Sequence, residues 1–132
     1  MNVVPNRQNR AVMYLRVGSA HSEDQKILDL QRQGCRQIAA KHGLQIIREY
    51  ADIGRPAVLE RQTALLQLLE NLARQHDAAY VVTWHYSRVG KTMDQIDDVE
   101  RRLRDVESSI VTLTGVETVK RFTTLLADTD EH

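Results

Sequence analysis

The chain has 132 residues, which is about one domain and enough to bury an ordinary hydrophobic core without disulfides. Eighteen Lys and Arg residues balance eighteen Asp and Glu residues, so the formal net charge is zero and any contact with phosphate has to be local. The single cysteine excludes an intrachain disulfide, and the sequence lacks the apolar run of about 18 residues that a membrane span needs. These features predict a cytoplasmic protein without membrane contact.

The first part of the chain predicts a strand followed by a helix. Residues 1–10 show neither periodicity nor an apolar signal core and are expected to form a flexible N-terminus. The apolar run at 11–17 contains one arginine and predicts the first strand. Apolar residues at helical spacing follow over about 22–42, where Ser22 and Gln25 have the pattern of a capping box.

The remaining elements continue the alternation of strands and helices. Gly43 is placed to end the first helix, and residues 51–58, with one glycine and one proline, predict a loop. Further strands are predicted at 44–50, 78–84 and 109–113, and further helices at 60–75, 93–106 and 116–127. This order predicts an α/β domain of three layers over residues 11–115, with a mostly parallel sheet of four to five strands flanked by helices. Residues 116–132 are expected to be the start of a further helix and an acidic tail.

Several common kinds of site are not expected. Gly90-Lys91-Thr92 resembles the end of a P-loop, but His85 stands where that motif needs its first glycine. The five histidines are scattered, which argues against a metal site, and no cofactor is expected. His85 is the only histidine near a predicted strand end, where a solvated loop position is expected. Cys35 lies in an amphipathic helix and is expected to be a buried, inert thiol.

The candidate site lies where the predicted parallel strands end, because ligands bind beyond the carboxyl ends of such strands. Three loops begin there, at Gly18, Asp52 and His85. Five basic residues are expected to approach this edge, namely Arg16, Arg55, Arg61, Arg88 and Lys91. One interpretation is that Arg16 pairs with a carboxylate such as Asp52 and the other basic residues are solvated. The alternative is an anion site, in which arginines bind the oxygens of a phosphodiester and stabilise its transition state.

Five segments stand in an order and spacing that carry a resemblance. They are YLRV at 14–17, LDLQ at 28–31, EYAD at 49–52, LERQTALLQLL at 59–69 and VVTWHYSRVGK at 81–91. Over residues 11–114 the chain resembles the catalytic domain of the resolvase/invertase serine recombinases, which implies a resolvase-like fold.

The resemblance also implies site-specific DNA strand exchange. A serine hydroxyl attacks a DNA phosphodiester, forms a 5′-phosphoserine link and releases a 3′-hydroxyl. A cluster of arginines, and no metal, assists this step. Dimers pair into a tetramer on DNA, and a long helix after the catalytic domain makes the interface between subunits.

The family's active-site residues map onto this chain only in part. The catalytic set implied here is Arg16, Gln31, Arg88 and Lys91, with Ser19 as a candidate nucleophile; the phosphate-binding set is Arg16, Arg61, Arg88 and Lys91, and the loop acid is Asp52. The family's nucleophilic serine falls on Gly18, which carries no hydroxyl. Other departures are Pro56-Ala57 in place of serine–glycine, Gln62 in place of the arginine that opens the next helix (with Arg61 one residue earlier), Ser87 in place of aspartate, and Lys91 in place of arginine. Lysine keeps the charge of arginine but not its planar fork.

These departures predict a degenerate active site. The favoured hypothesis is a catalytically impaired domain that serves DNA recombination as a regulatory or oligomerisation module, with weak DNA binding of its own or binding through a partner recombinase. It would form a homodimer or a hetero-oligomer through the helix over 116–127. The alternative is an active recombinase domain that uses Ser19, and a third possibility is a small-molecule binder built on the same sheet.

Overall fold

The computed structural model describes residues 7–18, 22–54 and 59–112. In chain order the elements are η1 (Arg7–Asn9), β1 (Arg10–Val17), α1 (Ser22–Lys41), β2 (Gln45–Ile53), η2 (Leu59–Arg61), α2 (Thr63–Gln75), β3 (Tyr80–Thr83), η3 (Tyr86–Arg88), α3 (Met93–Asp105) and β4 (Ser109–Thr112), where η marks a 3-10 helix. The helix and acidic tail expected over 116–132 lie outside the described residues, as do the side chains of Ser22 and Glu23.

The four strands form one parallel sheet in the order β2-β1-β3-β4. This confirms the predicted α/β class and its four-stranded form. Along β1 the two neighbouring strands end at different heights: pairing with β2 continues to Val17 and Ile53, whereas pairing with β3 stops at Tyr14 and Thr83. Beyond Tyr14, the edge of β1 that faces β3 therefore needs other hydrogen-bond partners.

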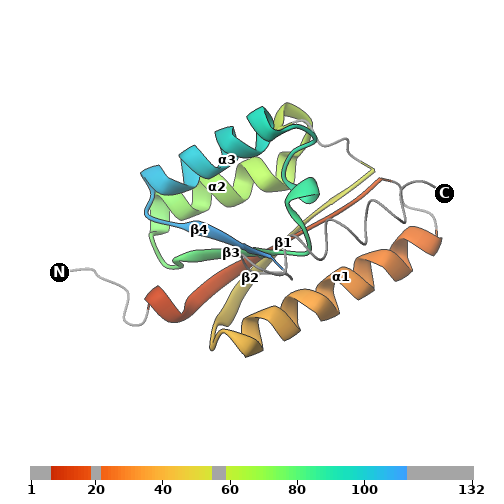
Figure 1. Ribbon diagram of the computed structural model, residues 1–132, viewed down its shortest axis with the longest axis horizontal. Coiled ribbons are helices and arrows are strands. Elements are labelled where there is room, and N and C mark those ends of the chain that lie inside the picture. Colours follow the sequence, from red (N-terminus) through yellow and green to blue (C-terminus); the bar gives the residue numbers. More distant parts are fainter. Residues whose placement is uncertain (1–6, 19–21, 55–58, 113–132) are drawn as a thin grey trace.

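The helices cover both faces of the sheet, with α1 on one side and α2 and α3 on the other (Figure 1). Alternate residues of β1 enter the two cores, because successive side chains of a strand point to opposite faces. Met13 and Leu15 pack with Leu28 and Cys35 of α1, whereas Tyr14 packs with α2 and α3. Burial on both faces explains why β1 is an almost continuous apolar run.

Two elements and one side chain differ clearly from the sequence-based expectations. The second strand extends to Ile53 rather than residue 50, because β2 stays paired with β1 along its whole length. The helix expected over 60–75 is two pieces, η2 and then α2. Ile27, placed by its spacing on the apolar face of α1, is 44% exposed. The end of that helix was predicted correctly: α1 stops at Lys41, and Gly43 has a φ of 67°.

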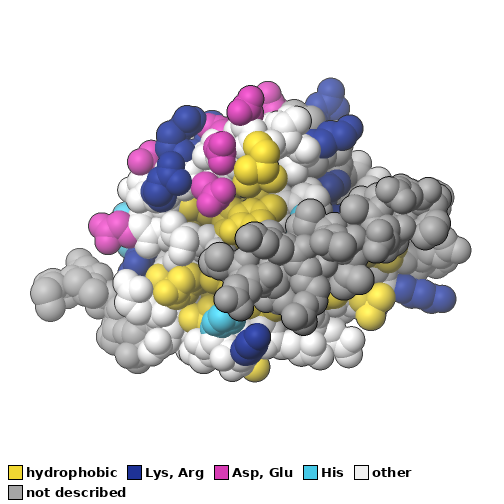
Figure 2. All heavy atoms as spheres, viewed as in Figure 1, with side chains coloured by type: hydrophobic (Ala, Val, Ile, Leu, Met, Phe, Trp, Pro, Cys, Tyr) yellow, Lys and Arg dark blue, Asp and Glu magenta, His cyan; other side chains and the backbone are white. Residues whose placement is uncertain are grey.

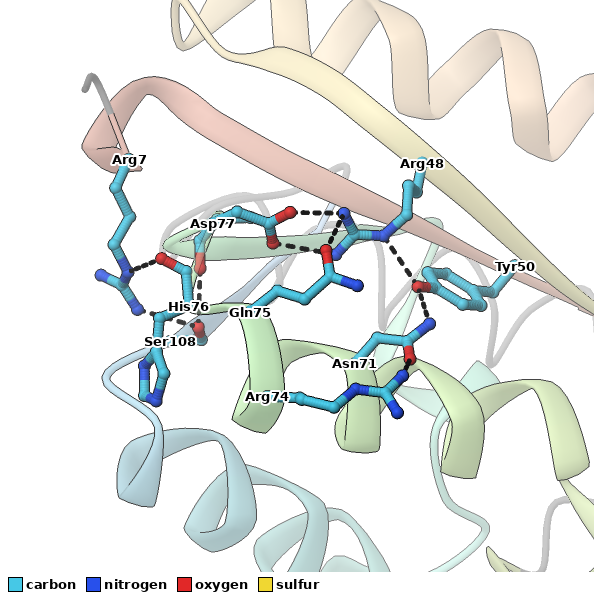
Figure 3. A network of polar contacts seen from close by, with 10 residues as sticks. Arg7, Arg48, Tyr50, Asn71, Arg74, Gln75, His76, Asp77 and Ser108 are labelled. Atoms are coloured by element: carbon cyan, nitrogen blue, oxygen red, sulfur yellow. Dashed lines mark hydrogen bonds and ion pairs between the residues drawn. The ribbon is translucent and has the colours of Figure 1, made fainter. Parts of the chain in front are cut away.

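The amino end of the sheet is held by arginines (Figure 3). Arg7, which was assigned to the flexible N-terminus, donates to the carbonyl oxygens of His76, Val106 and Glu107 at 3.2, 2.8 and 2.8 Å. It thereby joins the chain before β1 to the segments that follow α2 and α3. Residues 7–10, which were expected to belong to a flexible N-terminus, form η1 and the first residue of β1.

A second arginine joins β2 to the segment after α2 (Figure 3). Arg48 donates to both carboxylate oxygens of Asp77, at 2.5 and 2.9 Å, and to the hydroxyl of Tyr50 at 2.9 Å. The Arg48 guanidinium lowers the pKa of the Asp77 carboxyl below its usual value of 3.8. The ion pair therefore stabilises the fold at pH values above 3.8, the pKa of the unfolded carboxyl. This contribution is lost as the pH falls through the lower pKa of the folded state.

Gly34 makes room for the only tryptophan of the chain. A Cβ added at Gly34 in the middle of α1 would lie 2.1 Å from Cζ3 of Trp84, so the indole ring packs directly against the helix backbone. Replacing a helical glycine by alanine normally stabilises a protein by about 1 kcal/mol. Here we expect the reverse: Gly34→Ala destabilises the fold by roughly 1–3 kcal/mol, because overpacking outweighs the propensity gain. Urea unfolding followed by Trp84 fluorescence measures this, with Gln37→Ala on the exposed side of α1 as the matched control.

Cys35 confirms the expectation of a buried thiol. It is 0% exposed, and burial raises the pKa of its thiol to about 12. We expect native protein at pH 8 to react with a thiol reagent more than about 100-fold more slowly than protein in denaturant, since the thiolate is the nucleophile.

The raised pKa of Cys35 also means that the folded state loses stability as the pH rises from the ordinary thiol pKa of 9.0 towards 12. Removal of the thiol in Cys35→Ala should flatten that part of the stability profile; an equally steep profile in the variant would contradict the assignment.

Candidate functional site

The chain leaves β1 at Gly18, beyond the carboxyl edge of the sheet. Gly18 is exposed, and a Cβ built on it meets no atom of the described residues within 4 Å. Its φ is not in the positive range, in contrast to those of Gly43 and Gly54. Neither space nor backbone conformation therefore requires a glycine at this position. Ser19, the other candidate at this strand end, lies outside the described residues.

Arg16 and Arg88 hold each other by reciprocal hydrogen bonds. The Arg16 guanidinium donates from Nε to the carbonyl oxygen of Arg88 and from Nη2 to that of Ser87, both at 3.2 Å. The Arg88 guanidinium donates from Nη1 to the carbonyl oxygen of Arg16 at 2.9 Å. Both residues are half-buried. Backbone dipoles thus place two positive groups side by side where β1 ends, an arrangement suited to an anion.

Gln31 fixes the strand end from the α1 side. Its Oε1 accepts from the backbone N–H of Arg16 at 3.2 Å, and its Nε2 donates to the carbonyl oxygen of Arg16 at 2.9 Å. Gln31 is only 3% exposed. It supplies the partners that β1 lacks after pairing with β3 stops, so a buried amide takes the place of a neighbouring strand. Its contacts make it a positioning residue for Arg16.

Asp52 lies in a second, buried group of contacts. It is 3% exposed, accepts from the Tyr14 hydroxyl at 2.7 Å, and accepts from the backbone N–H groups of Ala64 and Leu65 at 2.9 and 3.2 Å. Its carboxylate therefore caps the N-terminus of α2, where negative charge is favourable. One interpretation of the sequence was that Arg16 pairs with Asp52. The contacts of the Asp52 carboxylate are instead with the Tyr14 hydroxyl and with backbone N–H groups of α2.

Gln62 links the two groups. This residue is 0% exposed, and its Nε2 donates to the Tyr14 hydroxyl at 2.8 Å and to the carbonyl oxygen of Arg88 at 2.9 Å. Desolvation by burial, more than any other cause, raises the pKa of Tyr14. The Tyr14 hydroxyl is thus a neutral group that donates to Asp52 and accepts from Gln62. Gln62 connects β1, η3 and the start of α2 from inside the domain.

Two other predicted site residues within the described ranges, Arg61 and Lys91, take no part in these side-chain contacts. Arg61 and Lys91 are exposed, and within the described ranges their side chains make no hydrogen bond to the Arg16–Arg88 pair. The backbone N–H of Lys91 donates to Oε1 of Gln95 at the start of α3. Arg55, Pro56 and Ala57 lie outside the described residues.

His85 differs from the expectation of a solvated loop histidine. It is half-buried, and its Nδ1 accepts from the backbone N–H of Ser87 at 3.1 Å. It therefore caps η3, which carries Arg88. Among the residues that the structure describes, no group of three His, Cys, Asp or Glu side chains could hold a metal ion. None of the described helices is long and apolar enough to cross a membrane.

Sequence reasoning missed the roles of Tyr14 and Gln62. Tyr14 reads as part of an apolar strand, and the bond from its hydroxyl to Asp52 depends on the register of β1 with β2. Gln62 was noted only as a replacement for an arginine. The sequence offered one signal for this role: Gln62 stands immediately before the leucine stripe of α2, at the position of the helix N-cap.

Comparison with known proteins places this site in a family. The family described as "Resolvase, N terminal domain" matches residues 11–130. A search of curated proteins gave no match.

Several solved structures share the fold. The C-terminal catalytic domain of ISC1926 TnpA, an IS607-like serine recombinase, aligns with a TM-score of 0.69 at 22% identity, covering 90% of this chain and 77% of that chain. The N-terminal catalytic domain of TP901-1 integrase gives 0.70 at 17% identity, covering 92% and 94%. A resolvase family site-specific recombinase from Streptococcus pneumoniae gives 0.70 at 15% identity, covering 94% and 87%.

At such identities the structural matches show the fold alone, and the family match carries the assignment. It spans residues 11–130, which include the three described α-helices and every described strand except for Arg10, the first residue of β1. The chain therefore belongs to the family of the resolvase N-terminal domain, the catalytic domain of serine recombinases.

Proposed function

We propose that this domain is a catalytically impaired member of the family, which serves DNA recombination as a regulatory or oligomerisation module. The observation that carries the proposal is Gly18 at the end of β1, next to the paired Arg16 and Arg88. The resemblance implies that a serine hydroxyl at this position attacks the phosphodiester. Glycine has no atom that can form the phosphoserine bond.

The contacts of Gln62 support the same conclusion. The resemblance implies an arginine here to stabilise the charge that grows on the phosphate. Gln62 is fully buried and directs its Nε2 towards Tyr14 and the carbonyl oxygen of Arg88. It is also uncharged. Loss of one donor from a charged transition state costs about 10²–10³ in rate. Gln62 in place of arginine, together with Gly18 in place of serine, therefore makes strand exchange much slower than in an intact site.

The second candidate function is an active recombinase that uses Ser19, because this hydroxyl follows Gly18 directly. Consecutive Cα atoms are about 3.8 Å apart, whereas near-attack geometry tolerates a displacement of only about 1 Å. The loop would have to form again around Ser19 to bring its oxygen to the position of the missing one. This is why impairment is the favoured proposal.

Covalent trapping separates the two functions. The full chain is incubated with nicked suicide DNA duplexes and analysed on a denaturing gel, in parallel with Ser19→Ala. The proposal predicts no protein–DNA adduct with either protein. An adduct that disappears in Ser19→Ala would establish the active alternative and defeat the proposal.

The proposed partners are DNA and other subunits. The zero net charge supports weak DNA binding by the domain alone, because nucleic-acid affinity depends on neutralised phosphates. Association with a second copy or with an active recombinase, through the segment over 116–132, would supply the remaining DNA affinity. Sedimentation of the chain with and without duplex DNA tests this. A monomer whose sedimentation does not change when DNA is added at low salt would contradict both parts.

A further inference from the structure

The outer side of the α2 and α3 layer carries a groove remote from the arginine pair. One part, of about 530 Å³, lies between η2, α2 and the start of α3; a second part, of about 420 Å³, continues towards the ends of both helices. Leu66 and Arg102 line both parts, so the two parts adjoin. We name them together the α2/α3 groove.

The α2/α3 groove has an apolar floor. Leu59 and Leu66 are half-buried, Leu69 is 9% exposed, and Ala73 continues the row along α2. Leu69 belongs to the core cluster and Leu59 packs against it, so the floor is the outer edge of the core, and Leu66 and Ala73 are more open to the groove. A partly exposed apolar floor of this kind suits the packing of another helix.

The walls of the α2/α3 groove are strongly acidic. Five carboxylates line it, namely Glu60, Glu70, Asp94, Asp98 and Asp105. Arg102 is the one basic side chain among these lining residues, and its Nε already pairs with Asp98 at 3.3 Å. In Figure 2, Asp and Glu side chains gather over this upper part of the molecule, with Lys and Arg side chains to either side and hydrophobic side chains close by. The lining residues themselves carry five carboxylates and one arginine, and Asp98 also pairs with Arg101 beside them, so the lining is acidic although the chain as a whole is neutral.

We propose that the α2/α3 groove is a docking site for a basic, amphipathic helix of a partner protein. The apolar floor would receive the leucine-like face of that helix, and its flanking lysines or arginines would meet the carboxylates of the walls. Phosphate groups would be repelled by the same carboxylates, so the groove is not a second DNA surface. With 13 residues, α2 is about 20 Å long, which matches a partner helix of about four turns. This inference is independent of whether the domain cleaves DNA.

The test uses a fluorescein-labelled peptide of about 18 residues made of leucine and lysine at helical spacing, with binding measured by fluorescence anisotropy. A triple variant, Glu60→Gln, Glu70→Gln and Asp94→Asn, removes three charges from the walls. The matched control, Asp29→Asn, Asp97→Asn and Glu100→Gln, removes three charges from side chains that do not line the groove. We expect about tenfold weaker binding for the first variant and less than about twofold for the control.

Further arms distinguish the possible occupants. Leu66→Ala should weaken peptide binding about fivefold through the lost apolar contact, and a peptide with the same composition but scrambled spacing should bind much more weakly. Equal losses in the two triple variants would mean unspecific attraction and would overturn the proposal. Binding of duplex DNA by the chain, or self-association of the chain, measured without the peptide and abolished only by the groove variants, would identify a different occupant and overturn it as well.

Discussion

Gly18→Ser is expected to give the domain a nucleophile and with it measurable covalent attachment to DNA. The added Cβ meets no atom within 4 Å among the residues that the structure describes, so the side chain fits without moving them. The hydroxyl would then emerge beside the paired guanidinium groups of Arg16 and Arg88. The yield on a suicide duplex should rise from undetectable to detectable but stay about 10²-fold or more below that of an intact site, because Gln62 and Lys91 remain.

Two further variants make this prediction specific. Gly18→Ala adds the same Cβ without a hydroxyl and should form no adduct, so it is the matched control. Adding Lys91→Arg to Gly18→Ser should increase the adduct about tenfold, because arginine restores a planar fork for two phosphate oxygens. The absence of any adduct with either serine-bearing protein would mean that the arginine pair does not hold a phosphodiester near residue 18.

Asp52→Ala is expected to destabilise the fold by about 3 kcal/mol. The substitution leaves the buried Tyr14 hydroxyl without its acceptor, which costs about 1–3 kcal/mol, and removes the cap from α2, which costs about 1 kcal/mol more. Urea unfolding at neutral pH gives the midpoint and the free energy of unfolding. Asp29→Ala, at a carboxylate whose side chain is 72% exposed, is the control and should change stability by less than about 0.5 kcal/mol.

Combining this change with Tyr14→Phe examines the network itself. In the double variant the hydroxyl and its acceptor are both gone, so the loss should be smaller than the sum of the two single losses. Strict additivity would show that Tyr14 and Asp52 contribute independently. The contact between them at 2.7 Å would then have little energetic weight.

The order of elements could be predicted because each carries its own local pattern. The apolar run of β1 reflects burial on both faces of the sheet, and the leucine stripe of α2 reflects burial on one face of a helix. The boundaries were less predictable, because they depend on pairing between distant segments. Ile53 belongs to β2 only because β1 lies beside it, and η2 breaks the helix expected over 60–75.

The candidate site was predicted in part, for the same physical reason. The strand-end position of Gly18 and the approach of Arg16 and Arg88 follow from parallel topology, and the structure brings these two arginines together. Their mutual hold through backbone carbonyls could not be predicted, because it depends on the tertiary path of η3. The buried role of Gln62 depends equally on how α2 meets the sheet.

The most direct measurement of the central claim is the intact mass of the wild-type protein after incubation with a suicide duplex, recorded beside Gly18→Ser. The wild-type chain should keep its unmodified mass, while a fraction of Gly18→Ser gains the mass of the attached DNA strand. A wild-type fraction that carries the strand would contradict the account, because the chain would then possess a working nucleophile without a serine at residue 18.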